Sequence, residues 1–168
     1  MPENYLDLTA NEQKDILQTA ASKLGKQESV LEKDIWVCWV LKALFSIKNY
    51  HPMAFKGGTS LSKVFGIIDR FSEDVDITLD YQFFEDTEYK EHPNVFDPFA
   101  DDTSKTQVKN FGKRLKKYVK SYTENVVVPH LESELIKLPT AKQHEIEVDE
   151  TGEKLVLRGF REVGCFFA

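Results

Sequence analysis

The sequence has few cysteines, no long hydrophobic run and no excess of positive charge. Its two cysteines, Cys38 and Cys165, lack CxxC or metal-ligand spacing, so we expect two reduced thiols, with Cys38 acting as a small hydrophobic residue in a helix. The longest unbroken apolar run, Ile35 to Leu41, is far shorter than the ~20 residues that cross a bilayer. No secretory signal pattern opens the chain. These absences exclude a disulfide scaffold and a membrane partner, and they predict a cytoplasmic protein.

The composition is that of a soluble globular protein. With 168 residues, 41% apolar and 12% aromatic, the chain can bury one core, and we expect a single domain over residues 1–168. The formal net charge is −6, so the molecule as a whole does not attract polyanions. Any site for a nucleic acid or a phosphate must therefore be local.

The first part of the chain, residues 1–50, reads as helical. Thr9 and Glu12 form a capping-box pattern, and the apolar spacing that follows runs to Gly25. Ser29 and Glu32 repeat the signature before a helix that is apolar on nearly every side, which predicts a buried helix.

The rest of the chain alternates strands and helices. Residues 51–80 read as a strand at 53–56, a Gly57-Gly58 bend, a helix from Thr59 and a strand at 74–79. Residues 81–102 read as an irregular insertion. Residues 104–139 read as a helical pair in which Pro129 either kinks the second helix or limits where it begins. Residues 143–168 read as a terminal hairpin with strands at 144–149 and 154–158 and a turn at Thr151-Gly152. The pattern predicts an α/β (α+β) fold, a small mixed sheet flanked by helices.

Two acids on the second predicted strand are the candidate catalytic and metal-binding residues. Side chains two apart in a strand share a face, which places the Cα atoms of Asp74 and Asp76 ~6.6 Å apart while Val75 and Ile77 face the core. Such carboxylates repel each other, and a divalent cation converts the repulsion into attraction. Because magnesium is usually held by one or two carboxylates plus phosphates and water, the pair predicts a Mg²⁺ (or Mn²⁺) site.

The glycine bend supplies a complementary phosphate site. Glycines allow the backbone to approach a phosphate, hydroxyls add donors, and basic side chains neutralise charge. The candidate nucleotide-binding residues are Lys56, Gly57, Gly58, Thr59, Ser60, Lys63, Arg70 and Ser72. A Gly-Gly pair or an acid pair alone is most often only a turn or an exposed edge, but their combination is rarer. A P-loop is excluded because GxxxxGK[ST] is missing.

These motifs resemble a known family. Residues 56–63, Lys-Gly-Gly-Thr-Ser-Leu-Ser-Lys, and 70–76, Arg-Phe-Ser-Glu-Asp-Val-Asp, resemble the signature of the AbiEii/AbiGii nucleotidyltransferase toxins, a branch of the polymerase-β-like superfamily. Residues 32–36, Glu-Lys-Asp-Ile-Trp, resemble an upstream segment of that family. The resemblance is specific over about residues 30–80.

The resemblance implies a nucleotidyltransferase core with metal at Asp74 and Asp76 and triphosphate contacts at residues 57–60. It also implies the toxin of a toxin–antitoxin or abortive-infection system, which has a cognate antitoxin and transfers a nucleotide from a nucleoside triphosphate to an acceptor such as tRNA. The superfamily normally supplies a third carboxylate. Glu147 has the right apolar-acid-apolar pattern, but a solvent-facing acid on a hairpin is slightly favoured, and the third acid is expected beyond Ala168.

Three functions remain open at this stage. The first is an active nucleotidyltransferase. The second is a catalytically incomplete fragment, from a truncated gene product or an inactive relative, that binds nucleotide or antitoxin. The third is a kinase-like use of the same fold, in which the γ-phosphate moves.

One charged surface is also predicted. Between Asp102 and Glu124 there is no acid, and four lysines recur at i, i+4 spacing; we call Lys105, Lys109, Lys113 and Lys117 the basic stripe. It can follow an RNA backbone or reach the triphosphate, or it can remain a solvated helix face, and neither the functional nor the structural interpretation is preferred. The four histidines are assigned to surface or capping roles, and Trp36 and Trp39 to the core.

Overall fold

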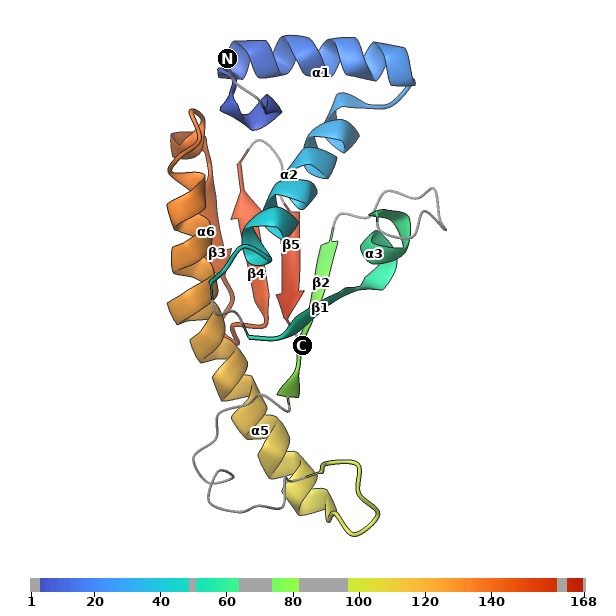
Figure 1. Cartoon of the computed structure of the whole chain (residues 1–168), viewed down its shortest axis with the longest axis vertical. Coiled ribbons are helices and arrows are strands. Elements are labelled where there is room, and N and C mark those ends of the chain that lie inside the picture. Colours follow the sequence, from blue (N-terminus) through green and yellow to red (C-terminus); the bar gives the residue numbers. More distant parts are fainter. Residues whose placement is uncertain (1–3, 49–50, 64–73, 82–96, 160–162, 168) are drawn as a thin grey trace.

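The first helices form one end of the molecule. The computed structural model describes residues 4–48, 51–63, 74–81, 97–159 and 163–167. After a 3-10 turn, η1 (Tyr5–Asp7), helix α1 spans Ala10–Leu24 (Figure 1). Thr9 and Glu12 form the predicted capping box, and Gly25 ends the helix in the left-handed conformation with φ 63°. Both predicted boundaries of α1 are confirmed.

Helix α2 (Glu28–Leu44) differs from its prediction in two respects. It begins earlier, because Ser29 already lies in the first helical turn and Gln27 is the N-cap without a side-chain cap bond; the predicted cap at Ser29 is wrong. Acidic Glu28 favours this start, since it lies at the positive end of the helix dipole. The helix buries a stripe and not its whole surface, because Cys38 is exposed. The prediction of a buried helix is therefore wrong for the side that carries Cys38, although both cysteines are free thiols as predicted.

The centre of the fold is a five-stranded mixed sheet with strand order β1-β2-β5-β4-β3. Strands β2 and β5 are parallel, and the other neighbours are antiparallel. The first four strands match the predicted segments, and β5 was not predicted as a strand. The strands are β1 (Met53–Lys56), β2 (Asp74–Leu79), β3 (Glu145–Val148), β4 (Lys154–Arg158) and β5 (Val163–Phe167). The α/β class is confirmed.

One face of the sheet forms the core. Alternate residues of the three inner strands are buried there, and α2 contacts β2 and β5 on this side. Leu131 and Leu135 of α6 (Val128–Leu135) belong to the same buried cluster. The sheet residues of this core are Val75, Ile77, Leu79, Leu155, Leu157, Val163, Cys165 and Phe167.

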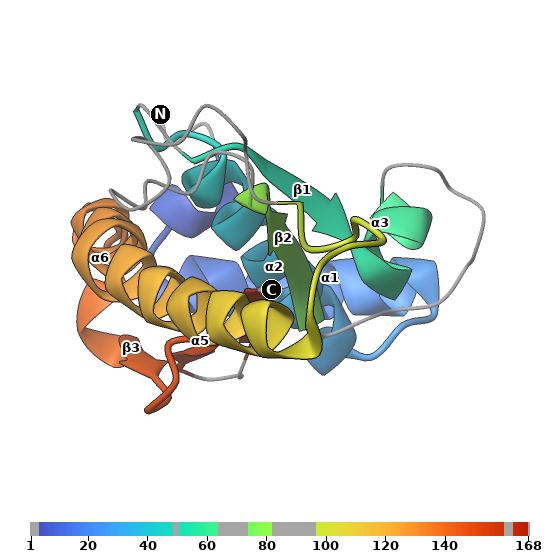
Figure 2. The ribbon, with the colours of Figure 1, turned by 90° about the horizontal axis from the view of Figure 1, so that it is seen from below.

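Two further helical regions and a short 3-10 turn, η4 (Ala141–Gln143), complete the described helices. The short helix α3 (Gly57–Lys63) follows β1 directly, so it begins two residues before the predicted start at Thr59, and the predicted Gly57-Gly58 bend forms its first turn. Helix α5 (Lys105–Tyr122) continues through a π-helical turn, η3 (Thr123–Val127), into α6. The predicted helical pair is therefore one continuous rod (Figure 1), which Figure 2 shows from below. Pro129 lies in the first turn of α6, where its missing N–H removes an ordinary helical bond. Pro129 therefore lies near the start of α6, which is one of the two predicted alternatives, although α6 continues the rod directly from η3. No helix in the described ranges is long and apolar enough to cross a membrane.

Candidate functional site

The two acids of β2 lie on the same face of the sheet. Asp74 is exposed and Asp76 half-buried, whereas Val75 and Ile77 between and after them are buried on the other side. The predicted arrangement of the pair is confirmed. We call the side that bears Asp74 and Asp76 the polar face.

Asp76 is seated against the glycine bend. Gly57 directly follows β1, and Lys56 is the register partner of Asp76 across the β1–β2 ladder. Gly57 has φ 77°, a conformation that strongly favours glycine. A Cβ on Gly57 would overlap Oδ2 of Asp76. The glycine therefore makes room for the carboxylate.

Asp74 is seated on a second glycine, one that sequence reasoning missed. Gly164 of β5 is its register partner in the parallel ladder, and a Cβ there would lie 2.9 Å from Oδ1 of Asp74. Each carboxylate thus rests over a backbone position without a side chain. The available signal was a glycine between alternating apolar residues, which marks a close approach of backbone to another group.

The remaining predicted site residues fall into three groups. Lys56 is exposed on the polar face, and Gly58, Thr59 and Lys63 lie in α3 beside it. Ser60 is buried, and its hydroxyl donates to the Gly57 carbonyl at 2.9 Å, so it holds the bend in shape. Arg70 and Ser72 lie outside the described residues.

Glu147 does not reach the acid pair. It lies on the polar face but on β3, three strand steps from β2. Because neighbouring strands are about 4.8 Å apart, the separation is about 14 Å. Its carboxylate instead accepts a bond from Nε of Arg158 at 2.6 Å. Glu147 is an ordinary surface acid, the reading that the sequence favoured.

The pair fits a divalent cation by its donor chemistry. Two carboxylates on one face, each cleared of a neighbouring Cβ, are a ligand set that Mg²⁺ accepts when phosphates and water complete the shell. Within the described ranges no group of three or more acidic, histidine or cysteine side chains gathers to form an all-protein cage. A cation here would therefore depend on further ligands from a substrate.

The charge of Asp74 acts on a buried thiol on the other face of the sheet. Burial raises the pKa of the Cys165 thiol to about 12, and the charge of Asp74 adds to the rise. Cys165 lies beside Val75 on the core face, directly behind the acids. The buried thiol is therefore protonated and a poor nucleophile at neutral pH.

The basic stripe is exposed along α5. All four of its lysines are solvent-accessible, and none of them forms an ion pair with another described residue. The N-terminal half of α5 extends below the sheet in Figure 1. The stripe is a local positive surface on an acidic chain.

His51 and the two tryptophans have structural roles. His51 is buried, so the surface role, one of the two roles expected for the histidines, is wrong for this residue. Its Nε2–H donates to the Asp80 carbonyl at 2.7 Å, and the Tyr118 hydroxyl donates to its Nδ1 at 2.7 Å. This arrangement ties the far end of β2 to α5. Trp36 is a core residue as predicted, and Trp39 packs against the core from a half-buried position.

The comparisons with known proteins agree with the motifs. A family model described as "Nucleotidyl transferase AbiEii toxin, Type IV TA system" matches residues 39–158, which is more than half of the chain. The match includes the glycine bend and both aspartates. No curated protein and no solved structure gave a match.

Proposed function

Because the chain belongs to the AbiEii nucleotidyl transferase toxin family, we propose that it transfers a nucleotide from a nucleoside triphosphate to an RNA acceptor such as tRNA, with Mg²⁺ or Mn²⁺ at Asp74 and Asp76. The observation that carries the proposal is the seating of both carboxylates over glycines on one sheet face. As a member of a toxin–antitoxin family, the protein has a cognate antitoxin. We expect its expression alone to arrest growth.

When bound, the metal would supply Lewis-acid stabilisation of the charge that develops on the phosphate oxygens. The carboxylates of Asp74 and Asp76 would hold the cation and thereby fix where the triphosphate lies. Gly57 and Gly58 let the phosphates approach the backbone, and the ammonium of Lys56 neutralises charge beside Asp76. Thr59, Ser60, Lys63, Arg70 and Ser72 remain proposed contributors to the same phosphate site.

The proposed reaction is a substitution at the α-phosphorus. An acceptor hydroxyl oxygen forms the new bond to phosphorus, the bond to the bridging oxygen breaks, and pyrophosphate leaves. The proton of the hydroxyl passes to solvent. The chain's part is positioning and charge neutralisation, the two effects that dominate phosphoryl transfer.

The basic stripe supports a polyanionic acceptor. Four exposed lysines on one helix face match the repeated charges of an RNA backbone, and they lie on a chain whose net charge is −6. A phosphate-binding surface of this kind positions an RNA without reading its sequence. We therefore propose that the acceptor docks along α5.

The test is transfer of label from nucleoside triphosphates to total RNA with magnesium present. Asp76→Asn is expected to abolish transfer and to keep the fold. Glu147→Gln is the matched control, because it removes one negative charge from the same sheet face three strands away, and it should transfer normally. Normal transfer by Asp76→Asn would contradict the metal assignment, and release of nucleoside diphosphate in place of pyrophosphate would indicate a kinase.

A second function is favoured by one observation, the position of Glu147 on the far edge strand. Without a third acid near the pair, the chain would bind nucleotide or antitoxin and perform no chemistry. Triphosphate would then raise the melting temperature without label transfer to RNA. The same preparation of protein distinguishes the two functions.

A further inference from the structure

Four residues of the polar face stand in one row across the sheet. Lys56 of β1 pairs with Asp76 of β2, Asp76 pairs with Phe166 of β5, and Phe166 pairs with Lys154 of β4. Side chains in one register row of neighbouring strands project side by side from the same face. The row thus continues from the carboxylate of Asp76 to the ring of Phe166 and then to the ammonium group of Lys154.

The ring of Phe166 leans toward the acid pair. Its Cε2 atom lies 3.4 Å from the Cβ position of Gly164, the same point that lies 2.9 Å from Oδ1 of Asp74. The ring edge and the carboxylate are therefore neighbours above one glycine. A single aromatic residue on a surface needs no explanation, but this ring is half-buried among charged groups at the acid pair.

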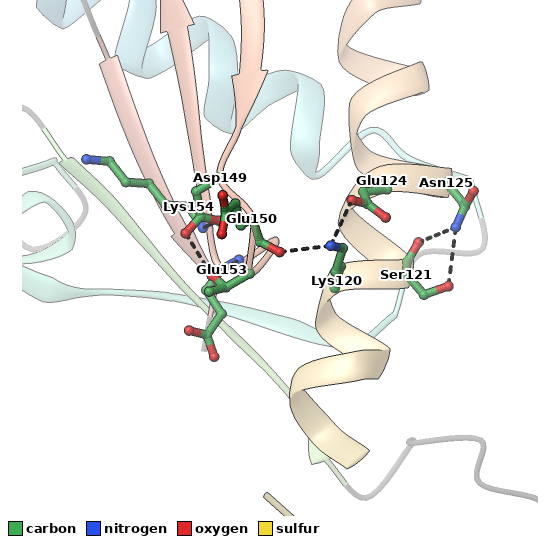
Figure 3. A network of polar contacts seen from close by, with 9 residues as sticks. Lys120, Ser121, Glu124, Asn125, Asp149, Glu150, Glu153 and Lys154 are labelled. Atoms are coloured by element: carbon green, nitrogen blue, oxygen red, sulfur yellow. Dashed lines mark hydrogen bonds and ion pairs between the residues drawn. The ribbon is translucent and has the colours of Figure 1, made fainter. Parts of the chain in front are cut away.

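Lys154 covers the ring from the next strand. Its Nζ atom lies 5.3 Å from the centre of the Phe166 ring. The backbone of Lys154 is held, because its N–H donates to Oδ1 of Asp149 at 3.1 Å and Lys120 of α5 donates to the Glu150 carbonyl in the same turn at 2.8 Å (Figure 3). The side chain itself is exposed, so the ammonium can leave the ring when a ligand arrives. A cation over an exposed ring is a weak contact.

We propose that Phe166 is the stacking platform for the base of the nucleoside triphosphate and that Lys154 donates hydrogen bonds to the outer edge of that base. The inference rests on the proposed function, which puts the phosphates at Asp74 and Asp76. The ribose and base then extend along the row, across the ring and toward Lys154. Base–aromatic stacking tolerates every base, since each has a π-face.

Lys154 would make the site prefer some bases over others. An ammonium is a donor only, so it favours bases that offer an acceptor carbonyl, such as guanine, cytosine and uracil, over adenine, which has no carbonyl and offers only ring nitrogens as acceptors. Lys154→Met keeps the length of the side chain and removes the donor. It is expected to reduce the discrimination against ATP and to leave the turn in place.

The decisive variants change the ring. Phe166→Leu keeps an apolar side chain and loses the π-face, and it should raise KM for the triphosphate about 10-fold at unchanged kcat. KM for RNA and the melting temperature should not change. Phe166→Tyr keeps the ring and should behave like the wild type. Three results would overturn the proposal. The first is an equal KM for the triphosphate in wild type and Phe166→Leu, and the second is a loss of triphosphate affinity in Phe166→Tyr. The third is a rise in KM for RNA without a rise in KM for the triphosphate.

Binding without turnover separates this inference from the proposed function. With Mn²⁺ present, the triphosphate-induced rise in melting temperature is measured for wild type, Phe166→Leu and Asp76→Asn. No rise in the wild type contradicts the proposed function. A rise that is equal in wild type and Phe166→Leu but lost in Asp76→Asn overturns the stacking platform and leaves the proposed function standing.

Discussion

The conformation and surroundings of Gly57 make a sharp prediction about catalysis. Gly57→Ala places a Cβ where Oδ2 of Asp76 lies, at a residue whose φ is 77°. Gly25→Ala is a matched control: Gly25 has φ 63°, and no atom lies within 4 Å of its Cβ position. The two variants share the backbone strain, and only one of them displaces the carboxylate.

The magnitudes follow from the two effects. An L-residue in the left-handed region costs about 1–2 kcal/mol. In a chain of this size each kcal/mol lowers the melting temperature by about 2–4 °C, so both variants should melt roughly 2–8 °C lower than the wild type. In Gly57→Ala the Asp76 side chain must also rotate away, which moves its oxygens by about 1 Å or more. A misplacement of that size lowers the rate about 100-fold.

The assay pairs thermal unfolding with transfer of label to RNA. Gly25→Ala should lose stability and keep its transfer rate at temperatures where it is folded, whereas Gly57→Ala should lose both. Equal transfer by the two variants would refute the reasoning, because it would mean that the carboxylate does not need the space over Gly57. A much larger loss of stability in Gly57→Ala than in Gly25→Ala would contradict the claim that the clash is absorbed by the side chain of Asp76.

Four further outcomes are expected. Gly164→Ala should lower the transfer rate with little change in melting temperature, because its Cβ would lie 2.9 Å from Oδ1 of Asp74 and displace that carboxylate. An unchanged rate would mean that Asp74 does not need the space over Gly164. Changing Lys109 and Lys113 together to glutamine should raise KM for RNA and make RNA binding less dependent on salt, while KM for the triphosphate stays unchanged. Equal salt dependence in the wild type and this variant would contradict a role of the basic stripe in RNA binding. A thiol reagent should modify Cys38 in the native protein and Cys165 only after unfolding. Burial raises the pKa of the Cys165 thiol in the folded protein to about 12 from 9.0. The protonated thiol therefore contributes stability below pH 9, and this contribution is lost as the pH rises toward 12. The melting temperature of Cys165→Ala should accordingly fall less than that of the wild type between pH 9 and 12.

The sequence was sufficient where structure depends on neighbours in the chain. Alternation fixed the face of Asp74 and Asp76, because side-chain direction in a strand has a period of two residues. The capping box at Thr9 and the glycine at 25 set the ends of α1 through local hydrogen bonds and a left-handed turn. The glycine bend after β1 was readable for the same reason.

The sequence was insufficient where structure depends on strand order. Strand β5 pairs in parallel with β2, a segment far away in the chain, and nothing local in Val163–Phe167 encodes that partner. The seat of Asp74 on Gly164 and the ring of Phe166 were therefore missed. The pattern around Glu147 gave the correct face, but only the order of strands shows that it lies at the far edge.

The central claim is that Asp74 and Asp76 hold one cation together with a triphosphate. The most direct test is the electron paramagnetic resonance of bound Mn²⁺, titrated into wild type, Asp74→Asn, Asp76→Asn and Glu147→Gln in the presence of a nucleoside triphosphate. We predict that wild type and Glu147→Gln bind the ternary Mn²⁺ complex with the same affinity and that both aspartate variants lose it. Equal Mn²⁺ affinity in all four proteins would contradict the account.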